Sequence, residues 1–259
     1  MFEKELEFAL KAGKEAQKVI MEYYNQGFHV EIKSDDSPVT EADKQADILI
    51  RKILSKEFPN YSFLTEESED DKTRLNNDYV WIVDPVDGTK DFVHKDGQFT
   101  TNIALSYKHE VVLGVVVIPA KNVIYYATKG QGAYKIDDKG LINKIHVNDK
   151  VENLTCLKSV FHSNELEENT IKKYSNKITK VEKAGSSLKA CLISEGKAEI
   201  SYRMSNGTKE WDTAAFQIIV EEAGGLVLKF DKSKIYYNRE DVYNRGGYLI
   251  INRIENFLI

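Results

Sequence analysis

Three apolar segments follow one another closely in the sequence, and they constrain the fold more than any other feature. They read QFTTNIALSY (98–107), VVLGVVVIP (111–119) and NVIYYAT (122–128). Runs of this length that are rich in β-branched and aromatic residues and are bounded by turn residues are typical of β-strands. Because the breaks between them are short, we predict a β-meander in which each strand pairs with the next.

The N-terminal part of the chain has a different pattern. Apolar residues recur at helical spacing over residues 3–25 and again over 41–58, which predicts two amphipathic helices. Thr40 stands directly before the second pattern and is its expected N-cap. The intervening KSDDSPVT (33–40) contains Pro38 and is predicted to be a turn.

The second half of the chain alternates between the two patterns. SLKACLISEG (187–196) and WDTAAFQIIVEEAGG (211–225) predict helices, the latter ended by two glycines. Short apolar runs after each of them predict strands. The order of elements indicates an α/β (α+β) fold built in layers, with an N-terminal half over residues 1–145 and a C-terminal half over 146–259.

Composition excludes several classes of protein. The formal net charge is −5 and the lysines are scattered along the chain, so we expect no nucleic-acid partner. The two cysteines lack CxxC spacing, which argues against a disulfide framework or a zinc site. The sequence contains no run of 18 apolar residues, so we predict no membrane span. The charged N-terminus lacks the apolar core of a signal peptide. We therefore expect a cytoplasmic protein.

The stretch WIVDPVDGTKDF (81–92) carries the first candidate site. A short apolar run, predicted to be a buried strand, ends in Asp84 and Asp87, and the hydroxyl of Thr89 follows. Two carboxylates three residues apart repel each other unless a cation lies between them. Hard divalent cations prefer oxygen ligands, so the pattern indicates a magnesium site. The alternative is an Asp-Pro turn followed by a capped helix.

Three further acids have both a structural and a functional interpretation. Glu66 belongs to the loop after SFLT (62–65) and could be a solvated surface charge. Asp212 stands at the start of an apolar helix, where Asp is a routine dipole partner. Asp43 lies three residues after Thr40, which is the spacing of a capping box. Each acid alone is ambiguous, but together they suggest one site.

Four motifs carry a resemblance to a known family. They are SPVTEAD (37–43), TEES (65–68), WIVDPVDGTKDF and EWDTAAFQIIVEEAGG (210–225). In this order and spacing they resemble the lithium-sensitive, magnesium-dependent phosphatases of the inositol monophosphatase superfamily, which also contains the 3′(2′),5′-bisphosphate nucleotidases. The resemblance covers nearly the whole chain. It implies a layered α-β-α-β-α sandwich with the metal ions at the junction of two halves.

The resemblance also implies roles for individual residues. Two or three Mg²⁺ ions are expected, one held by Glu66, Asp84 and the carbonyl of Val86, and another by Asp84, Asp87 and Asp212. Thr89 and Asp43 match the family's water-activating pair, and Glu66 is counted with them as catalytic. The expected substrate is a small phosphorylated molecule, and the residues expected to contact it are Asp87, Gly88, Thr89, Lys90, His162, Gly185, Ser186, Lys189 and Asp212.

Within the superfamily the sequence is more similar to the bacterial 3′(2′),5′-bisphosphate nucleotidases. DGTKDF (87–92), GQFTTNIAL (97–105) and GSSLKACL (185–192) match the pattern of that branch. Ser205 stands where inositol monophosphatases usually carry a glutamate. The resemblance therefore implies hydrolysis of adenosine 3′,5′-bisphosphate to AMP and phosphate.

The loop before the second metal motif departs from the nucleotidase pattern. It reads YRMSNGT (202–208) where that branch often has Y-P-R-x-G-P-T, so the arginine is displaced. Lys189 could instead be a helix lysine that reaches to solvent, and His162 matches the family only after a shift of one residue. An inositol-1-phosphate or sugar phosphatase is the alternative, and a non-catalytic nucleotide-binding module is a distant one. Inositol monophosphatases are commonly dimers, whereas the bacterial nucleotidases are less uniform, so the resemblance makes a homodimer one expectation for this chain.

Overall fold

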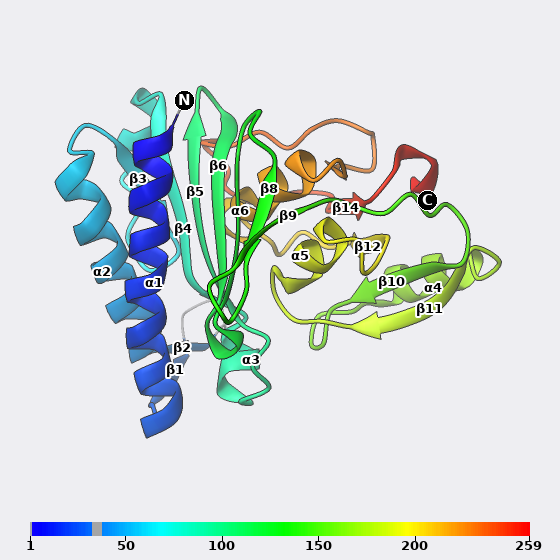
Figure 1. Ribbon diagram of the computed structural model, residues 1–259, viewed down its shortest axis with the longest axis horizontal. Coiled ribbons are helices and arrows are strands. Elements are labelled where there is room, and N and C mark those ends of the chain that lie inside the picture. Colours follow the sequence, from blue (N-terminus) through cyan, green and yellow to red (C-terminus); the bar gives the residue numbers. More distant parts are fainter. Residues whose placement is uncertain (1, 33–37) are drawn as a thin grey trace.

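Two β-sheets enclose a pair of helices in the computed structural model, which describes residues 2–32 and 38–259 (Figure 1). The larger sheet has seven strands in the order of the sequence, and the smaller has five strands with crossovers. Helices cover the outer face of each sheet. The layers therefore run α-β-α-β-α, which confirms the predicted architecture.

The seven-stranded sheet contains the predicted meander. Its first two strands are parallel and every later pair is antiparallel. Alternate residues of one strand face opposite cores, so Trp81 and Val83 lie in the outer core, and Val80 and Ile82 in the inner one. The strands are β3 (Ser62–Thr65), β4 (Tyr79–Asp87), β5 (Thr100–Tyr107), β6 (Glu110–Ile118), β7 (Val123–Thr128), β8 (Ala133–Ile136) and β9 (Ile142–Ile145).

The outer face of this sheet is covered by α1 (Glu3–Gln26) and α2 (Glu41–Glu57), as the apolar spacing predicted. Thr40 is the N-cap of α2. The predicted turn over 33–40 falls partly outside the described residues, since 33–37 are not among them. Its last part differs from the prediction, because β2 (Pro38–Thr40) pairs antiparallel with β1 (Val30–Ile32).

The central layer consists of α5 (Leu188–Ser194) and α6 (Glu210–Glu222). All but three residues of α6 are buried, because its two sides pack against the two different sheets. Gly114 of β6 allows the helix to approach closely: a Cβ there would lie 2.2 Å from the carbonyl oxygen of Ala215. This helix belongs to the C-terminal part of the chain, yet it forms the inner cover of the N-terminal sheet.

The five-stranded sheet has the order β11-β10-β12-β14-β13. Its outer face is covered by α4 (Glu165–Lys173), which buries Ile171 against it. The first two strands and α4 lie in a region for which the sequence predicted no element. The strands are β10 (Leu154–Lys158), β11 (Ile178–Lys183), β12 (Ile200–Arg203), β13 (Leu226–Leu228) and β14 (Tyr248–Ile251).

Short helical segments complete the chain. The five-residue helix α3 (Thr89–Val93) follows β4 directly. Three single turns of 3₁₀ helix lie at η1 (Thr73–Asn76), η2 (Pro119–Lys121) and η3 (Ile254–Asn256). No helix in the described ranges is long and apolar enough to cross a membrane. The division into residues 1–145 and 146–259 stays a prediction.

Candidate active site

The end of β4 places two carboxylates at one point. Asp84 lies opposite Asn102 of β5 and Asp87 lies opposite Thr100, so the β4 side of the ladder has one residue more. Such a bulge bends the strand and re-aims its side chains. Gly88 follows with a φ of 86°, which favours glycine, and the chain turns there into α3. The local sequence thus explains why both acids face the same side.

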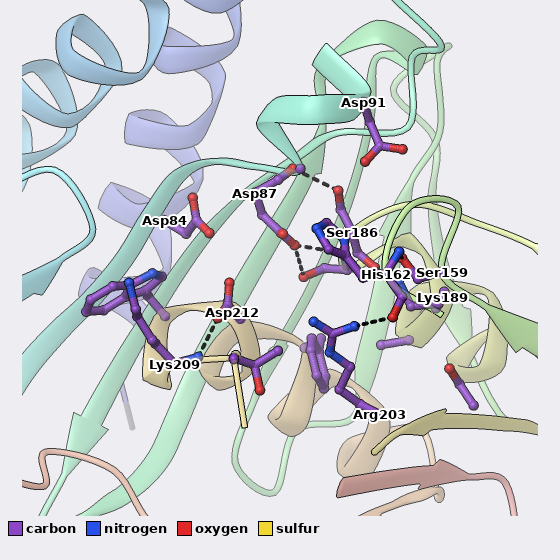
Figure 2. A pocket seen from close by; sticks show the side chains of 18 of the residues that line it. Asp84, Asp87, Asp91, Ser159, His162, Ser186, Lys189, Arg203, Lys209 and Asp212 are labelled. Atoms are coloured by element: carbon purple, nitrogen blue, oxygen red, sulfur yellow. Dashed lines mark hydrogen bonds between the residues drawn. The ribbon is translucent and has the colours of Figure 1, made fainter. Parts of the chain in front are cut away.

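Asp212 joins these two acids from the N-terminal turn of α6. One carboxylate oxygen from each of Asp84, Asp87 and Asp212 lies within 4.8 Å of the others. Figure 2 shows the three side chains around one space. Asp212 lies 125 residues after Asp87 in the sequence, and the fold brings the helix and the strand that carry them together.

The protonation behaviour of this cluster is unusual. Burial, followed by the charges of Glu66 and Asp87, raises the pKa of Asp84 well above its usual range. Burial and the neighbouring carboxylates also raise the pKa of Asp212 to about 8. Asp84 Oδ2 is buried without a hydrogen-bond donor in the described residues. A buried carboxylate oxygen without a donor, beside two further carboxylates, is an oxygen set that a hard cation such as Mg²⁺ would satisfy, so the residues fit that ion.

Glu66 lies beside the cluster in the turn that follows β3. Its backbone N–H donates to the carbonyl of Val83 at 3.2 Å, which fixes the turn against β4. Its charge raises the pKa of both Asp84 and Asp212, so it is electrostatically part of the same site. The carbonyl of Val86 accepts a hydrogen bond from Thr89 Oγ1 at 3.3 Å.

The carboxylate of Asp43 makes two different contacts. Its Oδ2 accepts the backbone N–H of Thr40 at 2.9 Å, which is the capping contact that the sequence suggested. Its Oδ1 accepts the hydroxyl of Thr89 at 3.3 Å. The structural and functional interpretations of this residue are therefore compatible, because each uses a different oxygen of a side chain that is 2% exposed.

The segment before α5 makes direct contact with the end of β4. Asp87 Oδ2 accepts both the N–H and the hydroxyl of Ser187, each at 2.9 Å. Ser186 Oγ donates to the carbonyl of Asp87 at 2.8 Å. A Cβ on Gly88 would lie 2.0 Å from Ser186 Oγ, and one on Gly185 would lie 2.5 Å from Asp91 Oδ1. Glycine at these two positions lets the loops touch.

Cationic side chains line the other side of the same cleft, whose volume is about 580 Å³. Lys189 Nζ donates to the carbonyl of Ser186 at 2.8 Å, and burial lowers the pKa of Lys189 to about 8. Arg203 donates to the carbonyl of His162 at 2.8 Å, and its Nε is buried without an acceptor in the described residues. Partial burial and nearby positive charges lower the pKa of His162. Lys90 is exposed at the edge.

Ser187, Arg203 and Asp91 are among the residues of this cleft that were not predicted as site residues. Ser187 holds Asp87, although the sequence singled out its neighbour Ser186. Arg203 lines the cleft despite its displaced position in YRMSNGT. Asp91 is 3% exposed, and burial together with a hydrogen bond to Asp96 raises its pKa to about 7. Its place in DGTKDF was the only signal for it.

The sequence as a whole matches the model of one family, the inositol monophosphatase family, over residues 1–255. The chain belongs to the inositol monophosphatase family. The predicted family is thereby confirmed, and the chain is a phosphomonoesterase of that family. The family is metal-dependent and implies a phosphorylated small-molecule substrate, and the cluster of Asp84, Asp87 and Asp212 could hold a metal ion.

Relatives within this family include nucleotidases and an inositol monophosphatase. The chain is 38% identical to the 3′(2′),5′-bisphosphate nucleotidase CysQ of Buchnera aphidicola, over 96% of this chain and 94% of that protein. It is 33% identical to an inositol monophosphatase of Mesembryanthemum crystallinum, over 87% and 84%. The crystal structure of CysQ from Bacteroides thetaiotaomicron superposes with a TM-score of 0.84 at 33% identity, covering 97% of this chain and 98% of that one.

Proposed function

We propose that this chain is a 3′(2′),5′-bisphosphate nucleotidase that hydrolyses adenosine 3′,5′-bisphosphate to AMP and phosphate. The observation that carries the proposal is the division of one cleft into an acidic and a basic side (Figure 2). The acidic side fits metal ions that bind the scissile phosphate. The basic side, with Lys189 and Arg203, fits a second phosphate, which an inositol monophosphate lacks.

The metal ligands are proposed as follows. Glu66, Asp84 and the carbonyl of Val86 hold one Mg²⁺, and Asp84, Asp87 and Asp212 hold another, so that Asp84 is shared. The proposal allows for two or three Mg²⁺ ions in the site. When bound, the ions supply positive charge that stabilises the phosphoryl oxygens and makes an attacking water more acidic. Asp84 Oδ2, which is buried without a donor in the described residues, is an oxygen that such an ion would satisfy.

Asp43, Thr89 and Glu66 are proposed to orient and deprotonate the attacking water. The oxygen of that water bonds to phosphorus while the bond from phosphorus to the ribose 3′ oxygen breaks, and the ribose oxygen leaves as the 3′ hydroxyl of AMP by taking a proton from solvent water. Thr89 Oγ1 accepts the water's proton as it passes its own to Asp43 Oδ1, 3.3 Å away. Glu66, which also lines the cleft, is proposed to orient the water.

Substrate contacts follow from the same geometry. Gly88, Thr89 and Lys90 form the turn that opens α3, and their backbone N–H groups are proposed to face the scissile phosphate, beside Asp87 and Asp212. Gly185 and Ser186 keep the neighbouring loop close enough for Lys189 to reach the second phosphate. His162 is held by Arg203 at the same end of the cleft.

The proposal is tested by phosphate release in the presence of magnesium. We expect kcat/KM for adenosine 3′,5′-bisphosphate to exceed that for inositol-1-phosphate by about a hundredfold, a transition-state difference of about 2.7 kcal/mol. A preference for inositol-1-phosphate would contradict the nucleotidase assignment while leaving the metal site in place.

An inositol-1-phosphate phosphatase is the second candidate. The inositol monophosphatase of Mesembryanthemum crystallinum supports it through its 33% identity. Ser205 argues against it, because a hydroxyl there cannot replace the acidic contact to inositol that the family resemblance implies. A cytoplasmic location and a homodimer stay predictions.

Replacing Lys189 with Ala is expected to affect bisphosphate substrates selectively. The ammonium lies inside the cleft and loses its attraction for a second phosphate. We expect KM to rise by about tenfold more for adenosine 3′,5′-bisphosphate than for adenosine 3′-monophosphate, the energy of one charge-assisted hydrogen bond. Steady-state kinetics on both substrates measure this, with the exposed Lys183→Ala as the matched control. Equal increases for the two substrates would show that Lys189 does not read the second phosphate.

A further inference from the structure

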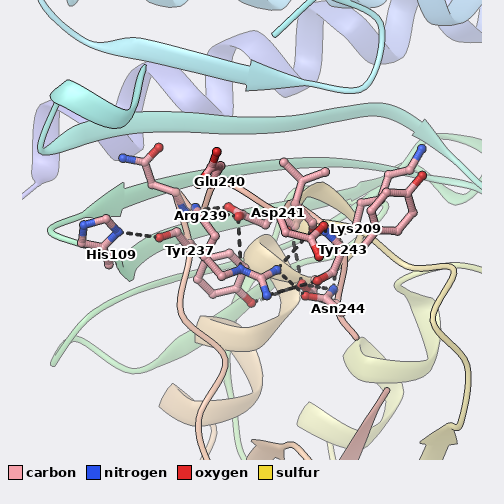
Figure 3. Close-up of polar contacts among 12 residues, drawn as sticks. His109, Lys209, Tyr237, Arg239, Glu240, Asp241, Tyr243 and Asn244 are labelled. Carbon is pink, nitrogen blue, oxygen red and sulfur yellow. Dashed lines mark hydrogen bonds and ion pairs between the residues drawn. The ribbon is translucent and has the colours of Figure 1, made fainter. Parts of the chain in front are cut away.

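A segment that follows the motif EWDTAAFQIIVEEAGG (210–225) in the sequence folds back against the start of α6. We call residues 237–244 the strap. Lys209 and Tyr243 form an isolated antiparallel bridge, and Glu210 N donates to the carbonyl of Val242 at 2.9 Å. Figure 3 shows the polar contacts that this arrangement creates. The strap thus pairs with the residues immediately before Asp212.

Glu210 is the centre of these contacts. Its side chain is 0% exposed, so its carboxylate depends on donors from the protein. It accepts the N–H of Asn238 at 2.6 Å, the N–H of Arg239 at 2.8 Å and Arg239 Nε at 3.2 Å. Both carboxylate oxygens are used, which fixes the strap to the first turn of α6.

Arg239 continues the network toward the other side of Asp212. Its guanidinium Nη2 donates to Asn244 Oδ1 at 2.8 Å. Asn244 Nδ2 donates in turn to the carbonyl of Lys209 at 2.8 Å and to Thr213 Oγ1 at 3.2 Å. Contacts on both flanks of Asp212 therefore determine where this part of α6 lies.

Arg74 links the strap to the segment that follows Glu66. It is 1% exposed and donates to Asn238 Oδ1 at 2.8 Å and to the carbonyl of Arg239 at 2.9 Å. It also binds Asp70 through two hydrogen bonds of 3.0 and 2.8 Å. The network therefore runs from Asp70, four residues after Glu66 in the chain, to the first turn of α6.

We propose that Glu210, Arg239 and Arg74 are positioning residues. Together they hold Glu66 and Asp212 at the spacing that the metal ions require. The inference rests on the proposed assignment of these two acids as ligands. Groups that orient metal ligands without touching the ion alter metal affinity when they are removed. None of the three network residues is among those that line the cleft in the described part of the chain, so they act through the ligands.

The test is a calorimetric titration of the full chain with Mg²⁺. In Glu210→Gln, one oxygen acceptor becomes a donor and the strap loses its fixed register. We expect the dissociation constant to rise about tenfold or more. Glu199→Gln is the matched control, because Glu199 is also 0% exposed and accepts from Thr155 N and Asn148 Nδ2 within the five-stranded sheet. Its magnesium affinity should stay within about twofold of the wild-type value.

Kinetics supply a second readout. A positioning defect predicts that excess magnesium restores kcat in Glu210→Gln, whereas a variant that has lost a ligand is not restored. Circular dichroism establishes that each variant is folded. If Glu210→Gln does not fold, Arg239→Lys is measured instead, because it keeps the positive charge beside Glu210 and loses the donor to Asn244.

The possible results separate the two proposals. Wild-type affinity in the folded network variant, or an equal loss in Glu199→Gln, would overturn the positioning role alone. A wild-type chain that binds no magnesium would overturn the ligand assignment of the proposed function and the positioning role with it.

Discussion

Replacing Asp87 with Asn is expected to reduce kcat/KM by about 10³-fold, a loss of about 4 kcal/mol of transition-state stabilisation. An amide is a weaker ligand than a carboxylate, and it removes one negative charge from the cluster with Asp84 and Asp212. The fold should remain, because the Asn oxygen still accepts from Ser187. Phosphate release from adenosine 3′,5′-bisphosphate measures the loss.

Thermal unfolding distinguishes a lost metal site from a damaged fold. Without magnesium, Asp87→Asn should melt no lower than the wild type, since it relieves repulsion between buried carboxylates. With magnesium, the wild type should gain more stability than Asp87→Asn does. Asp138→Asn, on an exposed turn, is the control and should behave like the wild type. Unchanged turnover in Asp87→Asn would contradict the metal assignment.

Gly114→Ala is expected to destabilise the fold by about 3 kcal/mol. The new methyl group would lie 2.2 Å from the carbonyl oxygen of Ala215 and 2.6 Å from Ile218 Cγ2, so α6 must move away from β6. Because Asp212 lies on the same helix, activity should fall as well. Denaturant titration measures the free energy of unfolding.

Gly207→Ala is the matched control for this change. Nothing lies within 4 Å of a Cβ at Gly207, and its backbone has no positive φ that favours glycine. Its free energy of unfolding should match the wild-type value within about 0.5 kcal/mol. If Gly114→Ala were equally stable, the close packing of α6 on the seven-stranded sheet would be disproved.

Local pattern was sufficient wherever one face of an element is apolar. The strands between residues 79 and 128 and the two N-terminal helices were predictable because alternation and helical spacing reflect burial directly. The position of Asp84 and Asp87 at the end of a strand was also predictable, because the apolar run that predicts the strand stops at them. The layered fold and the family followed from motifs that occur together.

The region from Leu154 to Lys183 was not predictable in this way. Five of the six residues of β11 are exposed, and α4 is mostly charged, so neither has an apolar face of its own. Pairing with β10 determines β11. Glu167 illustrates the problem: its carboxylate is 2% exposed and accepts the backbone N–H of Met204, a contact that no local rule indicates.

The same limit applies to the site. Ser187 and Asp87 are separated by a hundred residues, so only the tertiary structure reveals their two hydrogen bonds. Glu210 looks like an ordinary acid in the first turn of a helix, and its role depends on the strap. Asp43 shows that a satisfactory local explanation does not exclude a second function, because its two oxygens have different partners.

The position of α6 between the sheets has a consequence for synthesis on the ribosome. All seven strands of the larger sheet emerge before α6 does, and their inner face, with Val80, Ile82 and Val116, has no cover until then. A nascent chain with such a face is exposed to aggregation. Completion of the N-terminal sheet therefore has to wait for the helix that carries Asp212, so a truncated product lacks both the second half and a stable first half.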